Sequence, residues 1–170
     1  FWNPETAELR LDYVNGDGLD DLVSVRFDAI DVWLNVDGVG WTKDRHTFFG
    51  TPKAPEGKTR VRLVDVNGSG TRDILWGEAF SYKYIDLQGG KQPALLTRVD
   101  NGLGKTTELE YATSAEEMIA AAANKPWTRT MPTVTHVVKR VTDRDNLAQV
   151  GRPAGVYVTE YAYNNPVFEG

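Results

Sequence analysis

The sequence predicts an all-β fold with two repeats that resemble propeller blades, followed by a β-rich segment with one short helix. Over the first 100 residues, short runs rich in β-branched and aromatic residues alternate with Gly and Asp turns. A strand–loop–strand pattern occurs twice, with Asn15 and Asn67 at the same place in each copy, 52 residues apart. One segment near residue 114 has the signature of a helix start.

Composition excludes several functional classes. The 170 residues include 19 basic and 24 acidic side chains, giving a net charge of −5, whereas a nucleic-acid-binding domain normally has a basic face. Cys is absent, so disulfide frameworks and thiolate metal sites are excluded. No apolar run approaches the ~20 residues of a membrane helix. We therefore expect neither nucleic acid nor membrane as a partner of this segment.

The expected strands of the first 90 residues are short and separated by turns. Pro52 and Pro55 mark a loop between two groups of strands, because proline cannot donate to a sheet ladder. The expected strands are Leu9–Leu11, Asp21–Phe27, Ala29–Val36, Trp41–Phe49, Arg60–Val64 and Asp73–Trp76.

The two copies of the repeat align without gaps. Asn15-Gly16-Asp17-Gly18 corresponds to Asn67-Gly68-Ser69-Gly70, and Asp21 corresponds to Asp73. Repeats of about 40–50 residues made of short strands are typical of propeller blades. Two blades cannot close a propeller and the first residue is Phe, so we expect the chain to be an excised piece of a longer protein.

Residues 91–170 are expected to form a second region. Strands are expected over Lys105–Tyr111, Val134–Thr142 and Val156–Tyr163, where apolar and polar residues alternate. Ser114-Ala115-Glu116-Glu117 is a capping-box pattern, and it predicts a helix over about 114–124 with Ser114 as its N-cap. The predicted organisation is therefore two blade-like repeats over 1–90 and a β segment over 91–170.

The loop of the second repeat is a candidate Ca²⁺ site. Oxygen-bearing side chains recur at alternate positions of a tight loop with glycines, and Ca²⁺ takes six to eight oxygen ligands. Position 12 of an EF-hand would be Trp76 rather than Glu, and the flanks are strands, so this is no EF-hand. The alternative is a bare turn. The expected ligands are Asp65, Asn67, Ser69, the Thr71 carbonyl and Asp73.

The loop of the first repeat is less regular. Tyr13 stands where the second loop has Asp65, and Tyr is a poor Ca²⁺ ligand. Asn-Gly-Asp-Gly is also a common turn sequence, so metal and bare turn remain equally open here. The candidate ligands are Asn15, Asp17, Leu19 and Asp21.

The strand–loop–strand unit is similar to the FG-GAP/VCBS repeat of integrin-like propellers. Later motifs resemble, in order, the middle region of insecticidal toxin-complex B components of the TcdB type, which SpvB-like virulence proteins share. These motifs are Lys91–Leu96, Asn101–Gly104, Glu110-Tyr111, Lys125–Trp127, Val137–Val141 and Tyr161–Asn165.

The resemblance implies a non-catalytic structural and docking segment of a secreted or extracellular virulence toxin. In that family a propeller docks on a pore-forming A component, and an RHS-like repeat shell, completed by a C component or the same chain, encloses a toxic effector. The implied partners are those components or flanking parts of the same chain. Residues 91–170 would then lead into the shell.

Two alternatives come from other classes. A Ca²⁺-dependent adhesion or glycan-binding propeller would use exposed Trp side chains. A hydrolase would need convergent acids, bases and nucleophiles, which the motifs lack. Gly104-Lys105-Thr106 ends like a P-loop, but Val99 stands where that motif needs Gly. We therefore expect no catalytic residues.

Overall fold

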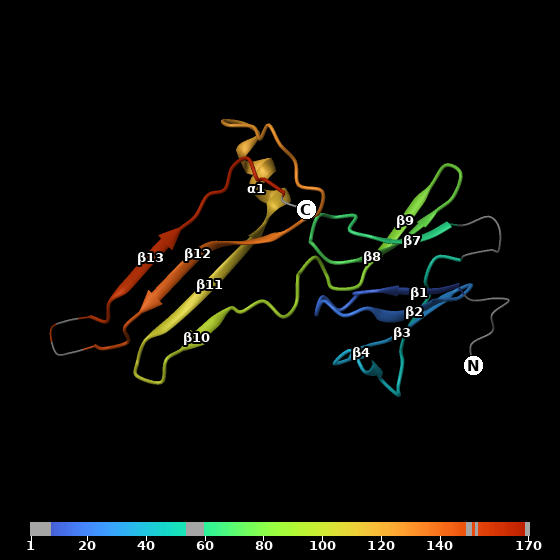
Figure 1. Ribbon diagram of the computed structural model, residues 1–170, viewed down its shortest axis with the longest axis horizontal. Coiled ribbons are helices and arrows are strands. Elements are labelled where there is room, and N and C mark those ends of the chain that lie inside the picture. Colours follow the sequence, from blue (N-terminus) through green and yellow to red (C-terminus); the bar gives the residue numbers. More distant parts are fainter. Residues whose placement is uncertain (1–7, 54–59, 149–150, 152, 169–170) are drawn as a thin grey trace. The chain divides into compact units, whose positions relative to one another are not determined.

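The computed structural model describes residues 8–53, 60–148, 151 and 153–168 and divides into two compact units (Figure 1). Unit 1 comprises residues 1–94 and unit 2 residues 95–170. Each unit is described by itself below. Among the described residues, no helix has the length and apolar character needed to cross a membrane.

The first sheet of unit 1 contains the first repeat. Its four antiparallel strands lie in the order β1-β2-β3-β6. A two-stranded ribbon, β4-β5, branches from the connection between β3 and β6. The strands are β1 (Glu8–Asp12), β2 (Asp21–Val25), β3 (Ala29–Trp33), β4 (Asn35–Val36), β5 (Gly40–Trp41) and β6 (His46–Phe49).

The second sheet of unit 1 contains the second repeat, with β7 (Arg60–Val64), β8 (Asp73–Gly77) and β9 (Tyr82–Asp86) in sequential antiparallel order. Its register reproduces that of the first sheet at the 52-residue offset. Arg10 pairs with Val23 as Arg62 pairs with Leu75, and Val25 pairs with Ile30 as Gly77 pairs with Tyr82. The repetition therefore extends through three strands.

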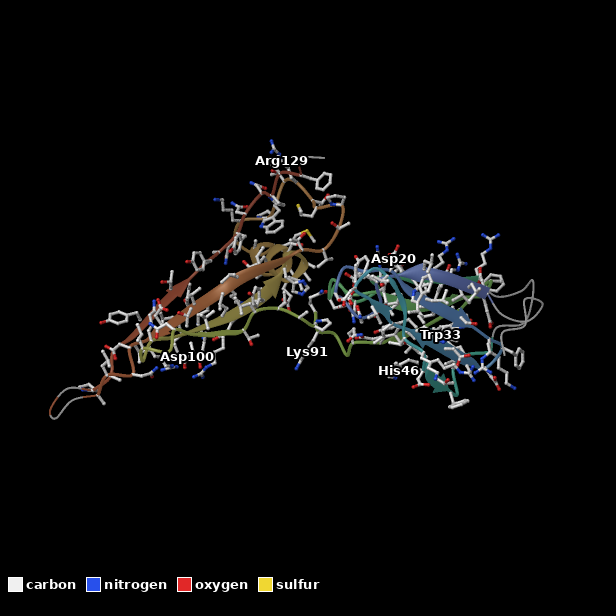
Figure 2. The ribbon with its side chains drawn as sticks, turned by 60° about the horizontal axis from the view of Figure 1, so that its bottom comes forward. Asp20, Trp33, His46, Lys91, Asp100 and Arg129 are labelled. Carbon is white, nitrogen blue, oxygen red and sulfur yellow. The ribbon has the colours of Figure 1, made fainter. Side chains whose placement is uncertain are left out.

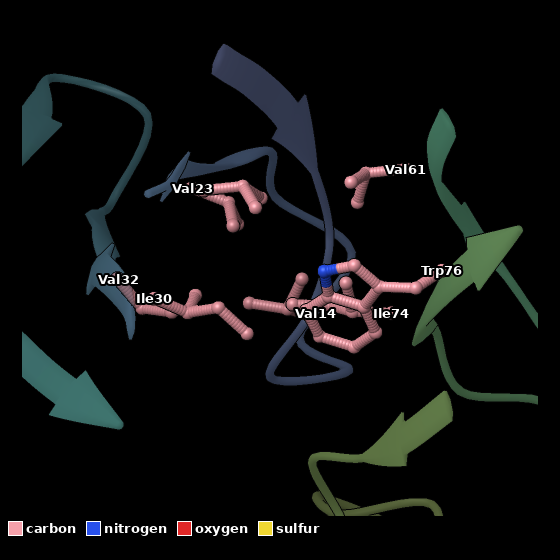
Figure 3. Packing of buried hydrophobic residues seen from close by; sticks show 8 residues of the cluster. Val14, Val23, Ile30, Val32, Val61, Ile74 and Trp76 are labelled. Atoms are coloured by element: carbon pink, nitrogen blue, oxygen red, sulfur yellow. The ribbon is translucent and has the colours of Figure 1, made fainter. Parts of the chain in front are cut away.

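The core of unit 1 lies between these two sheets (Figure 3). The indole of Trp76 packs with Ile74 against Val14 of the first loop, and Ile30 and Val32 lie opposite. Val23, Ile30 and Ile74 have no exposed surface. Since buried aliphatic side chains each contribute about 1.5–3 kcal/mol, this face-to-face packing holds the two repeats together.

Unit 2 is built on a four-stranded antiparallel sheet in the order β10-β11-β12-β13. The strands are β10 (Arg98–Asp100), β11 (Thr106–Thr113), β12 (His136–Arg144) and β13 (Val156–Glu160). A register shift between Glu110 and Tyr111 marks a bulge in the β11–β12 pair. Side chains project from both faces of the sheet (Figure 2). One face carries a charged row in which Arg140 pairs with Glu110 and Glu160.

The single described helix, α1 (Ser114–Ala121), follows β11 directly. The prediction that Ser114 is its N-cap is wrong, because Thr113 caps the helix. The Thr113 hydroxyl accepts from the Glu116 amide at 3.1 Å, and the Glu116 carboxylate accepts from the Thr113 amide at 2.8 Å. The Ser114 hydroxyl instead accepts from the Thr135 amide at 3.1 Å. The helix ends three residues before the predicted boundary of 124.

The all-β class with one short helix is confirmed in this coarse form. Two strands escaped the sequence analysis. Strand β9 has three exposed residues and no buried one, and β10 has only three residues, all exposed, so neither produces a clear apolar alternation. The expected strand Ala29–Val36 is interrupted after Trp33, and Trp41–Phe49 is divided between β5 and β6.

Candidate metal-binding loop

The two repeat loops connect equivalent strands and have the same backbone course. Gly16 and Gly18 have φ of 77° and 86°, and Gly68 and Gly70 have φ of 74° and 80°. This left-handed region is open to glycine at little cost, which explains the spacing of the glycines in both loops. The side chains that occupy this shared frame differ, and they decide what each loop can bind.

In the second loop, the carboxylate of Asp65 gathers the backbone. One oxygen accepts from the amides of Gly68 and Ser69 at 2.7 and 3.0 Å, and the other accepts from Gly70 at 2.8 Å. Asn67 adds a turn of its own, because its side-chain oxygen accepts from the Ser69 amide at 2.9 Å. These bonds hold the loop in a tight arc around the Asp65 carboxylate.

Asp73 closes the second loop from the first residue of β8. Its Oδ2 accepts from the Val66 amide at 2.8 Å, whereas its Oδ1 is buried and has no hydrogen-bond partner among the described residues. Burial raises the pKa of Asp73, and repulsion from Asp86 and Asp65 raises it further. A buried acceptor without a donor is costly. The Asp73 Oδ1 atom is such a buried acceptor, without a donor among the described residues.

The remaining predicted ligands of the second loop bond to residues other than Asp73. Ser69 and Thr71 are buried, and their hydroxyl groups are hydrogen-bonded to each other at 2.8 Å. The Asn67 side chain also faces β9, where its amide donates to Asp86 at 2.9 Å. Within the loop, Asp65 and Asn67 are thus linked to Ser69 through its amide, and Asp73 ties the loop to β8 through the Val66 amide.

Asp86, which the sequence analysis missed, belongs to the same group. It pairs with Asp73 across the β8–β9 ladder, and its second oxygen accepts from the Gln88 amide at 2.9 Å. No local motif marks Asp86, since it lies at the end of a strand that the sequence pattern did not reveal. The available signal was the 52-residue offset. It aligns Asp86 with Leu34, which follows the third strand of the first repeat.

In the first loop, protein donors already satisfy the corresponding aspartate. Asp21 Oδ2 accepts from Val14 and Asn15, and its Oδ1 accepts from the Asn35 amide at 2.8 Å. The other predicted ligands Asp17 and Asn15 are bonded to each other at 2.8 Å, and Asp17 also accepts from the Leu19 amide. Both carboxylate oxygens of Asp21 therefore have donors within the described residues.

Side chains from the segment after β9 also hold the first loop. Gln88 donates to the Val14 carbonyl and Gln92 to the Gly16 carbonyl, both at 2.8 Å. A Cβ on Gly16 would lie 2.8 Å from the Gln92 side chain, so the close approach requires glycine here. The carbonyls of Val14 and Gly16 therefore each accept from a side-chain amide of the segment that follows β9.

The donor set of the second loop fits a hard cation. Among the described residues, no group of three or more His, Cys, Asp or Glu side chains is arranged to hold a metal. Amide, hydroxyl and carbonyl oxygens would therefore have to complete the coordination around Asp65 and Asp73. Such mixed oxygen ligands suit Ca²⁺ rather than a transition metal.

Candidate sites for other functions remain scattered. Trp76 is core, whereas Trp41 is 47% exposed and lies on the β4-β5 ribbon; Trp2 lies outside the described residues. Trp33 and His46 lie on neighbouring strands of the first sheet (Figure 2), and His136 lies at the start of β12. The described part of the chain thus shows neither a Trp platform nor paired histidines.

Comparisons with known proteins agree with this architecture. A family model described as the insecticide toxin TcdB middle/N-terminal region matches residues 35–170. None of the curated proteins matches the chain.

Three solved structures are similar in fold. A crystal structure of TcdB2-TccC3 has a TM-score of 0.61, 24% identity and 85% coverage of this chain. The complex TcdB2-TccC3-Cdc42 has a TM-score of 0.61, 23% identity and 85% coverage. A Photorhabdus luminescens Tc holotoxin pore has a TM-score of 0.59, 21% identity and 81% coverage. This chain spans 7% of the length of each matched chain.

Proposed function

The chain belongs to the insecticide toxin TcdB middle/N-terminal region family, and from this membership we propose that it is a non-catalytic structural and docking segment of a toxin-complex B or SpvB-like protein. The family match over residues 35–170 is the observation that carries the proposal. In this role, unit 1 supplies two blades of a β-propeller and unit 2 supplies a wall segment that leads into an RHS-like shell.

The structure supports a scaffolding role in two ways. The two repeats bury a continuous apolar core between sheets, which is how repeat proteins build rigid frames. The sheet of unit 2 presents cross-strand ion pairs such as Arg98–Glu108 on its exposed surface. Function would then lie in the surfaces that the segment presents.

The proposed partners follow from the solved relatives. Those proteins are named as complexes of TcdB2 with TccC3 and as a Tc holotoxin pore. By analogy, the protein containing this segment would assemble with a C-type component and a pore-forming A component, act outside the producing cell, and help to enclose or deliver a toxic effector.

Assembly can be tested with the full-length protein. We expect it to co-purify with its C-type partner as a stable complex, and we expect Ile74→Asp, which places a charge in the core between the repeats, to reduce the yield of that complex. Phe80→Asp, at a fully exposed position in the turn between β8 and β9, is the matched control. A full-length protein that folds but never associates with either toxin component would refute the proposed function.

We further propose that the second loop binds Ca²⁺ through Asp65, Asn67, Ser69, the Thr71 carbonyl and Asp73. The unpaired Asp73 Oδ1 supports this assignment. Bound Ca²⁺ would neutralise the mutual repulsion of Asp65 and Asp73 and tie β8 to the loop. With two charged ligands, the affinity is expected in the range of about 10⁻⁴–10⁻³ M, as in extracellular modules.

Calorimetry on the 170-residue chain tests the Ca²⁺ site. Wild type should bind one Ca²⁺, and Asp65→Asn should lose the binding heat. Asp20→Asn is the control, because Asp20 is exposed in the first loop and only its backbone carbonyl accepts a bond, from Asn35. Equal heats for wild type and Asp65→Asn would remove Ca²⁺ from the second loop.

A further inference from the structure

The two repeats of unit 1 pack front to back rather than through equivalent faces. The first repeat buries Val23, Val25, Ile30 and Val32 in the core between the sheets. At the 52-residue offset, these positions correspond to Leu75, Gly77, Tyr82 and Tyr84. The second repeat instead buries Val61, Ile74 and Trp76, the counterparts of Leu9, Leu22 and Ser24. The first repeat therefore packs on the second through one face of its sheet. The second repeat packs on the first through the opposite, non-equivalent face.

That corresponding face of the second repeat is open. Tyr82 and Tyr84 are 75% and 49% exposed, and a hollow of about 440 Å³ lies over the β7–β8–β9 sheet. Arg60, Arg62, Leu75 and Tyr82 are among its lining residues. Because the two repeats use unlike faces, the second repeat still has free the face that the first repeat uses in the interface. This free face can bind a further unit.

One hydrogen bond between the two repeats also has an unoccupied counterpart on the open face. Arg10 of the first repeat donates from Nη2 to the Val61 carbonyl on β7 at 3.1 Å, and so it bridges the two repeats. The counterpart of Arg10 is Arg62, which pairs with Leu75 in the same register in which Arg10 pairs with Val23. Within the described residues, Arg62 has neither a carboxylate nor a carbonyl partner.

We propose that the open face of β7–β8–β9 is the docking surface for a further strand–loop–strand repeat, with Arg62 donating to a backbone carbonyl on the first strand of that repeat. The occupant presents large apolar side chains at the positions of Val61, Ile74 and Trp76. These side chains fill the hollow beside Leu75 and Tyr82, as Ile74 and Trp76 pack on the first repeat.

A second copy of this chain is a poor occupant. The face of the first repeat that is equivalent to the packed face of the second carries the buried Ser24 where Trp76 stands. The same face carries the buried Asp31, whose carboxylate is paired with Arg26 at 2.9 Å and Arg45 at 3.3 Å. A small hydroxyl and an engaged carboxylate cannot fill the hollow, so the partner is a different repeat of the longer protein.

Thiol labelling tests the docking surface, because the 170 residues contain no Cys. Tyr84→Cys reports on the face, and Phe80→Cys, at a fully exposed turn beside the same sheet, is the control. In the 170-residue chain both positions should label rapidly. In the full-length protein with other thiols removed, labelling of Tyr84→Cys should slow by about tenfold or more, since it then requires local opening, whereas Phe80→Cys should not change.

A second pair of variants tests Arg62 itself. In the full-length protein, Arg62→Met should raise the labelling rate of Tyr84→Cys several-fold. Lys83→Met should not, because Lys83 alternates with Tyr82 and Tyr84 along β9 and so lies on the opposite face of the sheet. Both variants should leave the melting point of the 170-residue chain unchanged.

Rapid labelling of Tyr84→Cys in the full-length protein would overturn the proposal, as would concentration-dependent protection in the 170-residue chain, which would identify a second copy as the occupant. The inference rests on the proposed function only in treating the repeats as blades. A protein that assembles with its toxin partners but leaves Tyr84 accessible would reject this inference alone.

Discussion

Arg72 of the second loop stacks on Tyr13 of the first, with its guanidinium carbon 5.0 Å from the ring centroid. The same guanidinium donates to the Asp12 carboxylate at 3.2 Å. Tyr13 stands where the second loop has Asp65, whose carboxylate accepts from three loop amides. The first loop therefore has, in place of a carboxylate, an aromatic ring that joins the two repeats.

This stacking predicts a measurable coupling between the repeats. Arg72→Ala and Tyr13→Ala should each destabilise unit 1, and a double-mutant cycle should give an interaction free energy of about 0.5–1 kcal/mol, because the pair is partly exposed. Denaturant unfolding of the four proteins measures it. Strictly additive losses would show that the stacking contributes nothing.

Because Asp73 has an unpaired oxygen, replacing it should raise the stability of the Ca²⁺-free protein and abolish Ca²⁺ binding. Asp73→Asn should stabilise the Ca²⁺-free protein by roughly 1 kcal/mol, because it removes a buried charge that repels Asp65 and Asp86 while keeping an oxygen for the Val66 amide. The same variant should lose the rise in melting point that Ca²⁺ causes in wild type. A variant that is less stable in chelator, yet still responds to Ca²⁺, would contradict the assignment.

The stabilisation by Asp73→Asn should depend on pH. Because the pKa of Asp73 is raised in the folded state, its favourable contribution is complete below the ordinary value of 3.8 and is lost as pH rises through the raised pKa. The advantage of Asp73→Asn over wild type should therefore be largest near pH 7 and vanish on acidification. Thermal melts in chelator from pH 3 to pH 7 measure it.

Asp143 of unit 2 should show the opposite sign. Hydrogen bonds from Thr107 and Lys105 lower the pKa of Asp143, so its contribution to stability is present above 3.8 and is lost as pH falls through the lowered value. Asp143→Asn should destabilise unit 2 near pH 7 and have less effect in acid. A pH-independent loss would assign the effect to packing instead.

The core between the repeats predicts a large effect at one position. Ile74 has no exposed surface and contacts the first repeat, so Ile74→Ala should cost about 2–5 kcal/mol of unfolding free energy. Ile119, at 70% exposure on α1, is the matched control, and Ile119→Ala should change stability by no more than about 0.5 kcal/mol. Similar losses for both would contradict the observed core.

The corrected helix cap predicts a difference between two neighbouring hydroxyls. Thr113→Ala should cost about 1 kcal/mol, whereas Thr113→Asp should retain most of the cap, because an aspartate oxygen can accept from the Glu116 amide. Ser114→Asp should not substitute for Thr113, since Ser114 bonds Thr135 rather than the helix. Urea unfolding followed by circular dichroism distinguishes these variants.

Local sequence patterns predicted the features that depend on local physics. The first two strands of each repeat, the glycine turns at residues 16–18 and 68–70, and the existence of α1 all follow from alternation, φ requirements and capping over a few residues. The cap itself was misplaced by one residue, because Thr113 and Ser114 both carry hydroxyls, and only the contact with Thr135 separates their roles.

The sequence by itself determined that the chain is β-rich, that it repeats at 52 residues, and that two loops are rich in oxygen-bearing side chains. Only the tertiary structure decided which loop contains a buried carboxylate oxygen that has no hydrogen-bond donor among the described residues. Asp21 and Asp73 occupy equivalent positions, yet the Asn35 amide satisfies one oxygen of Asp21, whereas the corresponding oxygen of Asp73 is buried without a donor. It also showed that Asp86 joins the loop and that the repeats pack through unlike faces. These outcomes depend on which distant donors and side chains reach each atom, and burial makes each such contact energetically decisive.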